Sequence, residues 1–137
     1  MLVSSNNAVE AIEYISSLEQ IEIETHHTIH GGLYTRTIKL NKNEILASVI
    51  IKIPTTLIVS GKIIIYSGDD EVKVSGYNVI PASEGRQQIM KAIEETTITM
   101  MFPTMANTVE DAEAEFTDYS DLLMSRFNKN NTIITGE

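Results

Sequence analysis

The side chains with the clearest capacity for chemistry are the chain's three histidines, which lie close together as His26, His27 and His30. A His-x-x-His spacing with a third imidazole beside it could hold a metal ion, because neutral imidazole is a common metal ligand. The surrounding segment is polar and ends in a pair of glycines. We therefore interpret it as a polar turn whose histidines bind backbone carbonyls or face solvent, and a metal site is the alternative.

A second set of candidates consists of basic residues spread over predicted strands. Arg36 and Lys52, if they point into a folded core, need an anion or a carboxylate partner, because a buried unpaired charge is costly. Together with Arg86 and Gln88 they would then form a pocket for a small acidic ligand. The alternative is that these side chains lie outside the core or extend along its rim to reach water.

The usual catalytic motifs are absent from the sequence. The chain has no cysteine, so it has no thiol nucleophile and no Cys-ligated zinc. Gly61-Lys62 lacks the further residues of a phosphate-binding loop, and no Gly-x-Ser-x-Gly sequence is present. The carboxylates of Asp69, Asp70 and Glu71 fall at a predicted hairpin tip, where turn chemistry explains the aspartates. The sequence therefore favours a non-catalytic protein.

Charge is distributed unevenly along the chain. The formal net charge is −9, which argues against binding to nucleic-acid phosphates. Many of the acidic side chains cluster near the C-terminal end, and a solvated helix face is the simpler explanation. The alternative is a docking surface for a basic protein partner. The candidate residues of this surface are Glu110, Asp111, Glu113, Glu115 and Asp118.

The elements that must position these residues are mainly strands. β-Branched residues are frequent, and such side chains fit a pleated sheet better than a helix. Residues 33–40 alternate, with Tyr34, Arg36, Ile38 and Leu40 on one side. Further short strands are predicted at 45–53, 57–59, 62–66, 71–74, 77–81, 88–93 and 96–102, separated by glycine-containing turns. Strands this short and numerous indicate a sandwich or closed barrel.

The chain reads as a single domain of 137 residues. Residues 1–24 are predicted as an N-terminal helix over 6–20 followed by an extended segment, and residues 107–127 as an acidic C-terminal helix. Residues 128–137 are predicted as a flexible tail. No signal-peptide pattern begins the sequence, and the longest apolar run, 45–53, is too short to cross a bilayer. We therefore expect a cytoplasmic protein that does not bind membranes.

The segment from Leu57 to Gln88, LIVSGKIIIYSGDDEVKVSGYNVIPASEGRQQ, resembles the second half of a cupin, a small double-stranded β-helix barrel. The resemblance covers residues 33–103. It implies a mainly β, cupin-type jelly roll with the N-terminal helix and the acidic C-terminal helix packed outside. In addition, Tyr34 to Ile38 and the run TVEDAEAEFTDYSDLLMSR are similar to cupin-like proteins encoded in bacteriophages and prophages.

The resemblance also shows which residues stand where metal-dependent cupins carry their ligands. The first ligand set falls near Ser48, Ile50 and Pro54, and the last near Arg86 to Gln88. Isoleucine, proline and arginine cannot ligate a divalent metal, and an amide is a poor substitute for imidazole. We therefore expect no metal and no other cofactor in the barrel.

These observations predict a non-catalytic cupin-fold phage protein, a structural or assembly component of the virion. It would act through protein contacts as a homo-oligomer or with other phage proteins, in the host cytoplasm when synthesised and then in the particle. One alternative is a small-molecule-binding cupin, or an enzyme with a displaced site, that uses a polar barrel pocket. The other is a phage-encoded inhibitor of a host defence protein, which would dock through the acidic helix.

Overall fold

A computed structural model describes residues 23–123 and 131–135, so the helix predicted over 6–20 lies outside the described residues. The described chain is mainly β, as the sequence predicted. Its elements, in chain order, are β1 (Glu24–His30), β2 (Leu33–Leu40), β3 (Ile45–Ala47), β4 (Thr55–Ser67), β5 (Asp70–Ala82), β6 (Gln88–Ala92), β7 (Thr96–Pro103), α2 (Val109–Phe116), the 3₁₀ turn η1 (Ser120–Leu122) and β8 (Asn131–Thr135).

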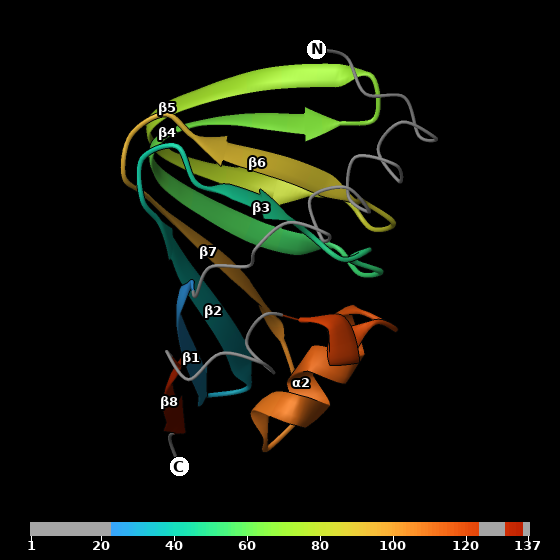
Figure 1. Ribbon diagram of the computed structural model, residues 1–137. Coiled ribbons are helices and arrows are strands. Elements are labelled where there is room, and N and C mark those ends of the chain that lie inside the picture. Colours follow the sequence, from blue (N-terminus) through green and yellow to red (C-terminus); the bar gives the residue numbers. More distant parts are fainter. Residues whose placement is uncertain (1–22, 124–130, 136–137) are drawn as a thin grey trace.

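The strands form one sheet of eight that curls into a half-barrel (Figure 1). Its order is β3-β6-β4-β7-β2-β1-β8, and β5 pairs with β4. The pairing of β1 with β8 is parallel, and the other pairs of strands are antiparallel. The curl brings strands from both ends of the chain to face a shared interior.

The sheet bends where β4 changes partner. Residues 56–60 of β4 pair with β7, and residues 63–67 pair with β6. Gly61 lies between these two parts with a φ of 142°, and a Cβ atom there would lie 2.4 Å from Thr96 Oγ1. Only glycine allows so close an approach, so Gly61 makes the corner of the half-barrel possible.

The glycines at 61 and 76 do not form the turns that the sequence suggested. Gly61 and Gly76 face each other inside a continuous hairpin of two 13-residue strands, β4 and β5. The sequence signal was ambiguous, because glycine inside a strand marks a bulge or close backbone approach as readily as a turn. The predicted short strands 57–59 and 62–66 are therefore one strand, and so are 71–74 and 77–81.

Two terminal segments also differ from their predictions. The polar segment that holds the histidines is strand β1, and its turn begins only at Gly31-Gly32. In the predicted flexible tail, residues 131–135 form β8 beside β1. β1 pairs with β2 along one edge and with β8 along the other, so the polar segment lies inside the sheet.

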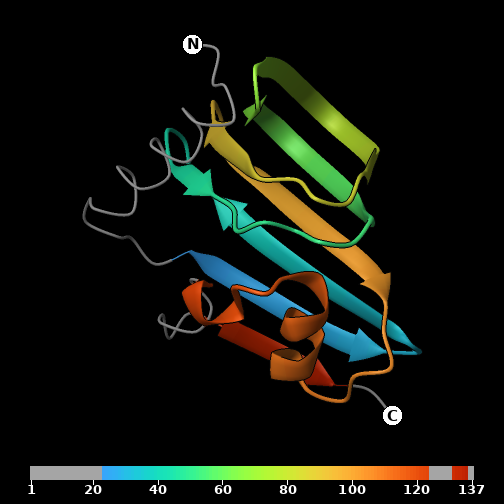
Figure 2. The same cartoon turned by 90° about the vertical axis from the view of Figure 1, so that its right-hand side faces the viewer.

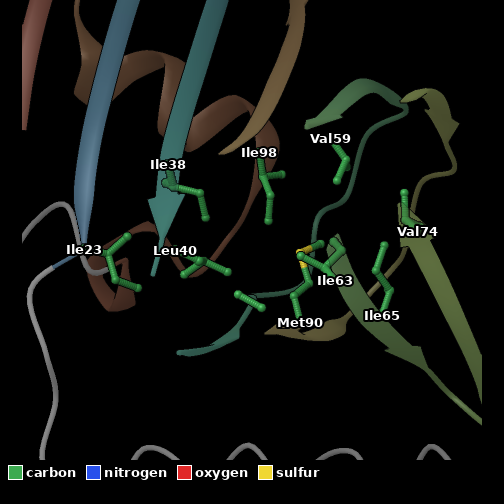
Figure 3. Packing of buried hydrophobic residues seen from close by; sticks show 10 residues of the cluster. Ile23, Ile38, Leu40, Val59, Ile63, Ile65, Val74, Met90 and Ile98 are labelled. Atoms are coloured by element: carbon green, nitrogen blue, oxygen red, sulfur yellow. The ribbon is translucent and has the colours of Figure 1, made fainter. Parts of the chain in front are cut away.

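The hydrophobic core consists of two clusters inside the curl. Figure 3 shows the first cluster, in which Ile38, Ile98 and Val59 from the neighbouring strands β2, β7 and β4 gather with Ile63 inside the curl. The alternation predicted for β2 is confirmed, because Tyr34, Ile38 and Leu40 are buried and Arg36 shares their side. The second cluster joins the inner faces of β1, β2 and β7 to α2.

Helix α2 covers the concave side of the sheet (Figure 2). Thr108 caps its start by accepting a hydrogen bond from the Asp111 backbone N–H, and the chain leaves the helical conformation at Thr117. The helix predicted over 107–127 is therefore shorter, and only the 3₁₀ turn η1 follows it within the described residues. None of the helices in the described ranges is long and apolar enough to span a membrane.

Candidate functional site

The concave side of the sheet holds a cavity of about 120 Å³. Strands β1, β2, β3, β4, β6 and β7 contribute to its wall, and the residues of α2 and η1 close one side. Most of the wall is apolar, including Ile38, Leu57, Met90, Ile98 and Phe116. The cavity therefore suits an apolar group, and its few polar side chains decide what else it accepts.

Arg36 is one of two arginines among the described residues that line the cavity, and its charge is matched. Its Nη1 donates to Glu113 Oε2 of α2 at 3.0 Å, and the two side chains are only 12% and 1% exposed. Its guanidinium also lies over the Phe116 ring, 5.8 Å from the centroid. The carboxylate partner that a buried arginine requires is thus supplied by the protein itself.

The position of Glu113 corrects its assignment to an exposed acidic surface. Val109, Ala112, Glu113 and Phe116 are all buried, at the i, i+3, i+4 and i+7 positions of the helix face that meets the sheet. This spacing was visible in the sequence and could have assigned Glu113 to the buried face. A carboxylate in that stripe needs a cation opposite it, and Arg36 of β2 is that cation.

A hydrogen-bonded group of buried side chains continues from Arg36. Its Nη1 lies 3.4 Å from the Tyr34 hydroxyl, which lies 2.8 Å from His27 Nδ1. Burial is the main reason that the pKa of Tyr34 is raised above its ordinary value of 10.0. His27 is therefore a structural partner of Tyr34 beneath α2.

The other two histidines lie apart from His27. His26 and His30 are exposed, and His26 Nε2 is 3.8 Å from Glu24 Oε2. Successive side chains of a strand point to opposite faces, so His26 and His27 cannot ligate the same ion. No group of three metal-ligating side chains occurs among the described residues.

Arg86 is the second arginine of the cavity wall, and its acceptors are neutral. It lies just before β6, and its backbone pairs with Ile51. Its Nη1 donates to Ser83 O at 2.8 Å and Ile53 O at 3.4 Å, while Nη2 donates to Thr55 Oγ1 at 2.5 Å and Met100 Sδ at 3.8 Å. Burial lowers the pKa of Arg86 from its ordinary value, although arginine keeps its charge at neutral pH. Within residues 23–123 and 131–135, no carboxylate pairs with it.

Gln88 and Ser48 complete the polar part of the wall next to Arg86. The Gln88 backbone N–H donates to Ser48 Oγ at 3.0 Å, and both residues line the cavity. A divalent metal does not fit this donor set. The described lining residues include no histidine or carboxylate, and the guanidinium of Arg86 would repel a cation.

Lys52 does not line the cavity, in contrast to the prediction. Its Nζ lies 2.7 Å from Asp118 Oδ1 in a solvent-exposed ion pair. Its backbone N–H donates to Phe116 O, which ties the segment before β4 to the end of α2. The pocket thus brings together Arg36, Arg86 and Gln88 from the predicted ligand-binding set.

The predicted acidic surface is also divided. Glu110 and Asp111 are exposed at the start of α2, whereas Asp118 pairs with Lys52. Glu115 accepts hydrogen bonds from the Thr104 hydroxyl at 2.6 and 2.9 Å. Much of the local negative charge therefore holds α2 and its flanking loops in place, and docking of a basic partner stays a prediction.

Comparison with known proteins bears on the fold. No family model and no curated protein matches the sequence. Among solved structures, the cupin domain of Cnp3 from Schizosaccharomyces pombe superposes with a TM-score of 0.51 at 13% identity, covering 76% of this chain and 74% of that one. A cupin-superfamily protein from Desulfitobacterium hafniense matches with a TM-score of 0.50 at 11% identity, covering 65% of this chain and 85% of that one.

The chain has a cupin fold. This confirms the fold expected from the glycine and strand pattern. In this cupin fold the described wall of the cavity inside the curled sheet includes Arg36 and Arg86 among apolar side chains. The fold alone does not decide what a site binds, so the function has to be argued from the cavity itself.

Proposed function

We propose that this cupin-fold protein binds a small organic molecule in the cavity of its curled sheet, without a metal ion. One observation carries the proposal: a cavity of about 120 Å³ with largely apolar walls includes Arg86, whose acceptors are neutral atoms. A cavity of about 150 Å³ lined by apolar side chains accommodates benzene. The space here therefore suits a ligand with an apolar body of similar or slightly smaller size.

A ligand screen against thermal unfolding tests this function. A ligand at about a hundred times its dissociation constant stabilises the folded state by about 2.7 kcal/mol. We expect such stabilisation from at least one of hexanol, hexanoate, benzyl alcohol and benzoate. The proposal is wrong if none of the four raises the melting temperature at concentrations up to their solubility.

A cavity-filling variant locates the binding. Ile98 of β7 lines the cavity with its side chain in the buried cluster, and its neighbour Thr97 is exposed on the other face of the strand. The substitution Ile98→Trp should abolish the stabilisation by ligand, whereas Thr97→Trp should leave it unchanged. Equal ligand stabilisation of both variants would place the ligand elsewhere on the protein.

A second candidate is a role in assembly through protein contacts, such as the virion role that the sequence suggested. It is supported by β5, a long strand whose described pairing is with β4, and whose Val72, Tyr77 and Val79 are exposed. Exposed apolar side chains on a sheet edge favour contact with another chain. Light scattering after size exclusion tests it: a single oligomer that dissociates on Val79→Lys supports the role, and a monomer at high concentration contradicts self-assembly.

A further inference from the structure

The two arginines of the cavity differ in how their charge is balanced. Glu113 stands against Arg36 at 3.0 Å, so this pair brings no net charge to the cavity. Arg86 is half-buried and is surrounded by backbone carbonyls, a hydroxyl and a thioether. Within the described chain, the cavity therefore carries one positive charge that its own wall does not neutralise.

The contacts of Arg86 leave part of its guanidinium available. Ser83 O and Thr55 Oγ1, at 2.8 and 2.5 Å, hold the group in a fixed orientation. The other two contacts, to Ile53 O at 3.4 Å and Met100 Sδ at 3.8 Å, are long. A thioether is a weak acceptor, and Met100 also lines the cavity. A carboxylate on that side would replace weak acceptors with a strong, charged one.

The apolar part of the cavity wall determines which body of the ligand, apart from its charged group, the cavity accepts. Leu57, Met90, Ile98 and Phe116 present hydrocarbon and sulfur surfaces, which favour an apolar body and disfavour a second charge. A dicarboxylate or a phosphate dianion would bring two negative charges to one unmatched positive charge. Charge balance and wall chemistry together select a singly charged acid.

On this basis we propose that the ligand is a monocarboxylic acid with an apolar body of about six carbon atoms, its carboxylate bound by Arg86. Gln88, which also lines the cavity next to β3, supplies an amide that can donate to the same carboxylate. This inference rests on the proposed function, since it names the chemical class that the same cavity accepts.

The experiment compares hexanoate with hexanol by isothermal titration of the full chain. The two probes share their carbon chain and differ in the charged end. Hydrogen bonds to a charged group contribute enough that we expect hexanoate to bind about ten- to a hundredfold more tightly. Arg86→Gln should remove this preference, so that the two probes bind with similar affinity. Lys52→Gln, which removes a cation outside the cavity, should change neither affinity.

The possible results separate the inference from the function it rests on. Equal affinity for hexanol and hexanoate in the wild-type protein would contradict the recognition of a carboxylate, but it would still support binding in the cavity. If neither probe binds, both the carboxylate inference and the proposed binding function are contradicted. A hexanoate preference that survives Arg86→Gln assigns the carboxylate to another group and overturns the role of Arg86. The wild-type comparison needs no variant, so it decides the ligand class even if Arg86→Gln does not fold.

Discussion

Two arginines among the described residues of the cavity wall are in opposite electrostatic situations. Beneath α2, Arg36 is paired with the buried Glu113 and lies over Phe116. Beside β6, Arg86 donates to neutral atoms. A buried charge that the protein itself neutralises serves the structure, whereas one that it leaves unmatched favours an incoming anion. Residue type alone would have assigned the two arginines the same role.

The largest expected effect comes from breaking the matched pair. Glu113→Ala leaves the Arg36 charge buried without its carboxylate, and removing one partner of a buried pair costs about 3–5 kcal/mol. Urea denaturation should show this loss. The double variant Arg36→Met with Glu113→Ala should recover much of it, because no unpaired charge then remains. Strict additivity of the single and double variants would contradict the coupling.

The second effect is a dependence of the stability on alkaline pH, which arises at Tyr34 beside the Arg36–Glu113 pair. Because burial raises the pKa of Tyr34 above 10.0, the folded state keeps a proton that the unfolded state releases. This contribution to stability is complete below pH 10 and decreases as the pH rises from there through the folded-state pKa. Tyr34→Phe should therefore lose less stability than the wild type between pH 9 and pH 11. An identical alkaline loss in both proteins would show that Tyr34 does not titrate differently on folding.

The substitution Arg86→Met should change the free energy of unfolding less than Glu113→Ala does. Arg86→Met removes hydrogen bonds to neutral acceptors, which contribute about 1 kcal/mol each, but it also removes the cost of desolvating the charge. We expect a net change in the free energy of unfolding within about 1–2 kcal/mol of zero. A loss as large as that of Glu113→Ala would mean that Arg86 is as structural as Arg36.

The smallest effect is expected at the exposed pair of Lys52 and Asp118. Its side chains are 41% and 74% exposed, and exposed pairs contribute about 0–1 kcal/mol. Lys52→Gln should change the free energy of unfolding by less than about 1 kcal/mol, and salt should abolish that difference. A larger effect would show that the Lys52 side chain contributes more than this ion pair.

The sequence predicted the parts of the fold that depend on local pattern. The alternation of residues 33–40 placed Arg36 on the side of Tyr34 and Ile38, and the structure has it there. Lys52 fell inside a strand predicted over 45–53, but β3 ends at Ala47. Lys52 therefore lies outside regular strands, where alternation gives the side chain no direction. The same limit applies to the corner at Gly61, since only the approach of Thr96 distinguishes it from a turn.

The candidate site was harder to predict, because its contacts join residues that are distant in the sequence. The spacing of Val109, Ala112 and Phe116 could have revealed that Glu113 is buried, but not that it meets Arg36. Similarly, β1 looked like a turn because its buried positions include Thr25 and His27. Polar side chains at inward positions hide the alternation of a strand, and their hydrogen-bond partners become known only with the fold.

The most direct test of the account is a crystal structure of the protein with benzoate, a probe with an apolar ring and a single negative charge. The account predicts the benzoate carboxylate within hydrogen-bond distance of the Arg86 guanidinium and the ring against Leu57 and Ile98, with the Arg36–Glu113 pair intact. A benzoate bound to Arg36 with Glu113 displaced, or an occupied surface site beside an empty cavity, would contradict it.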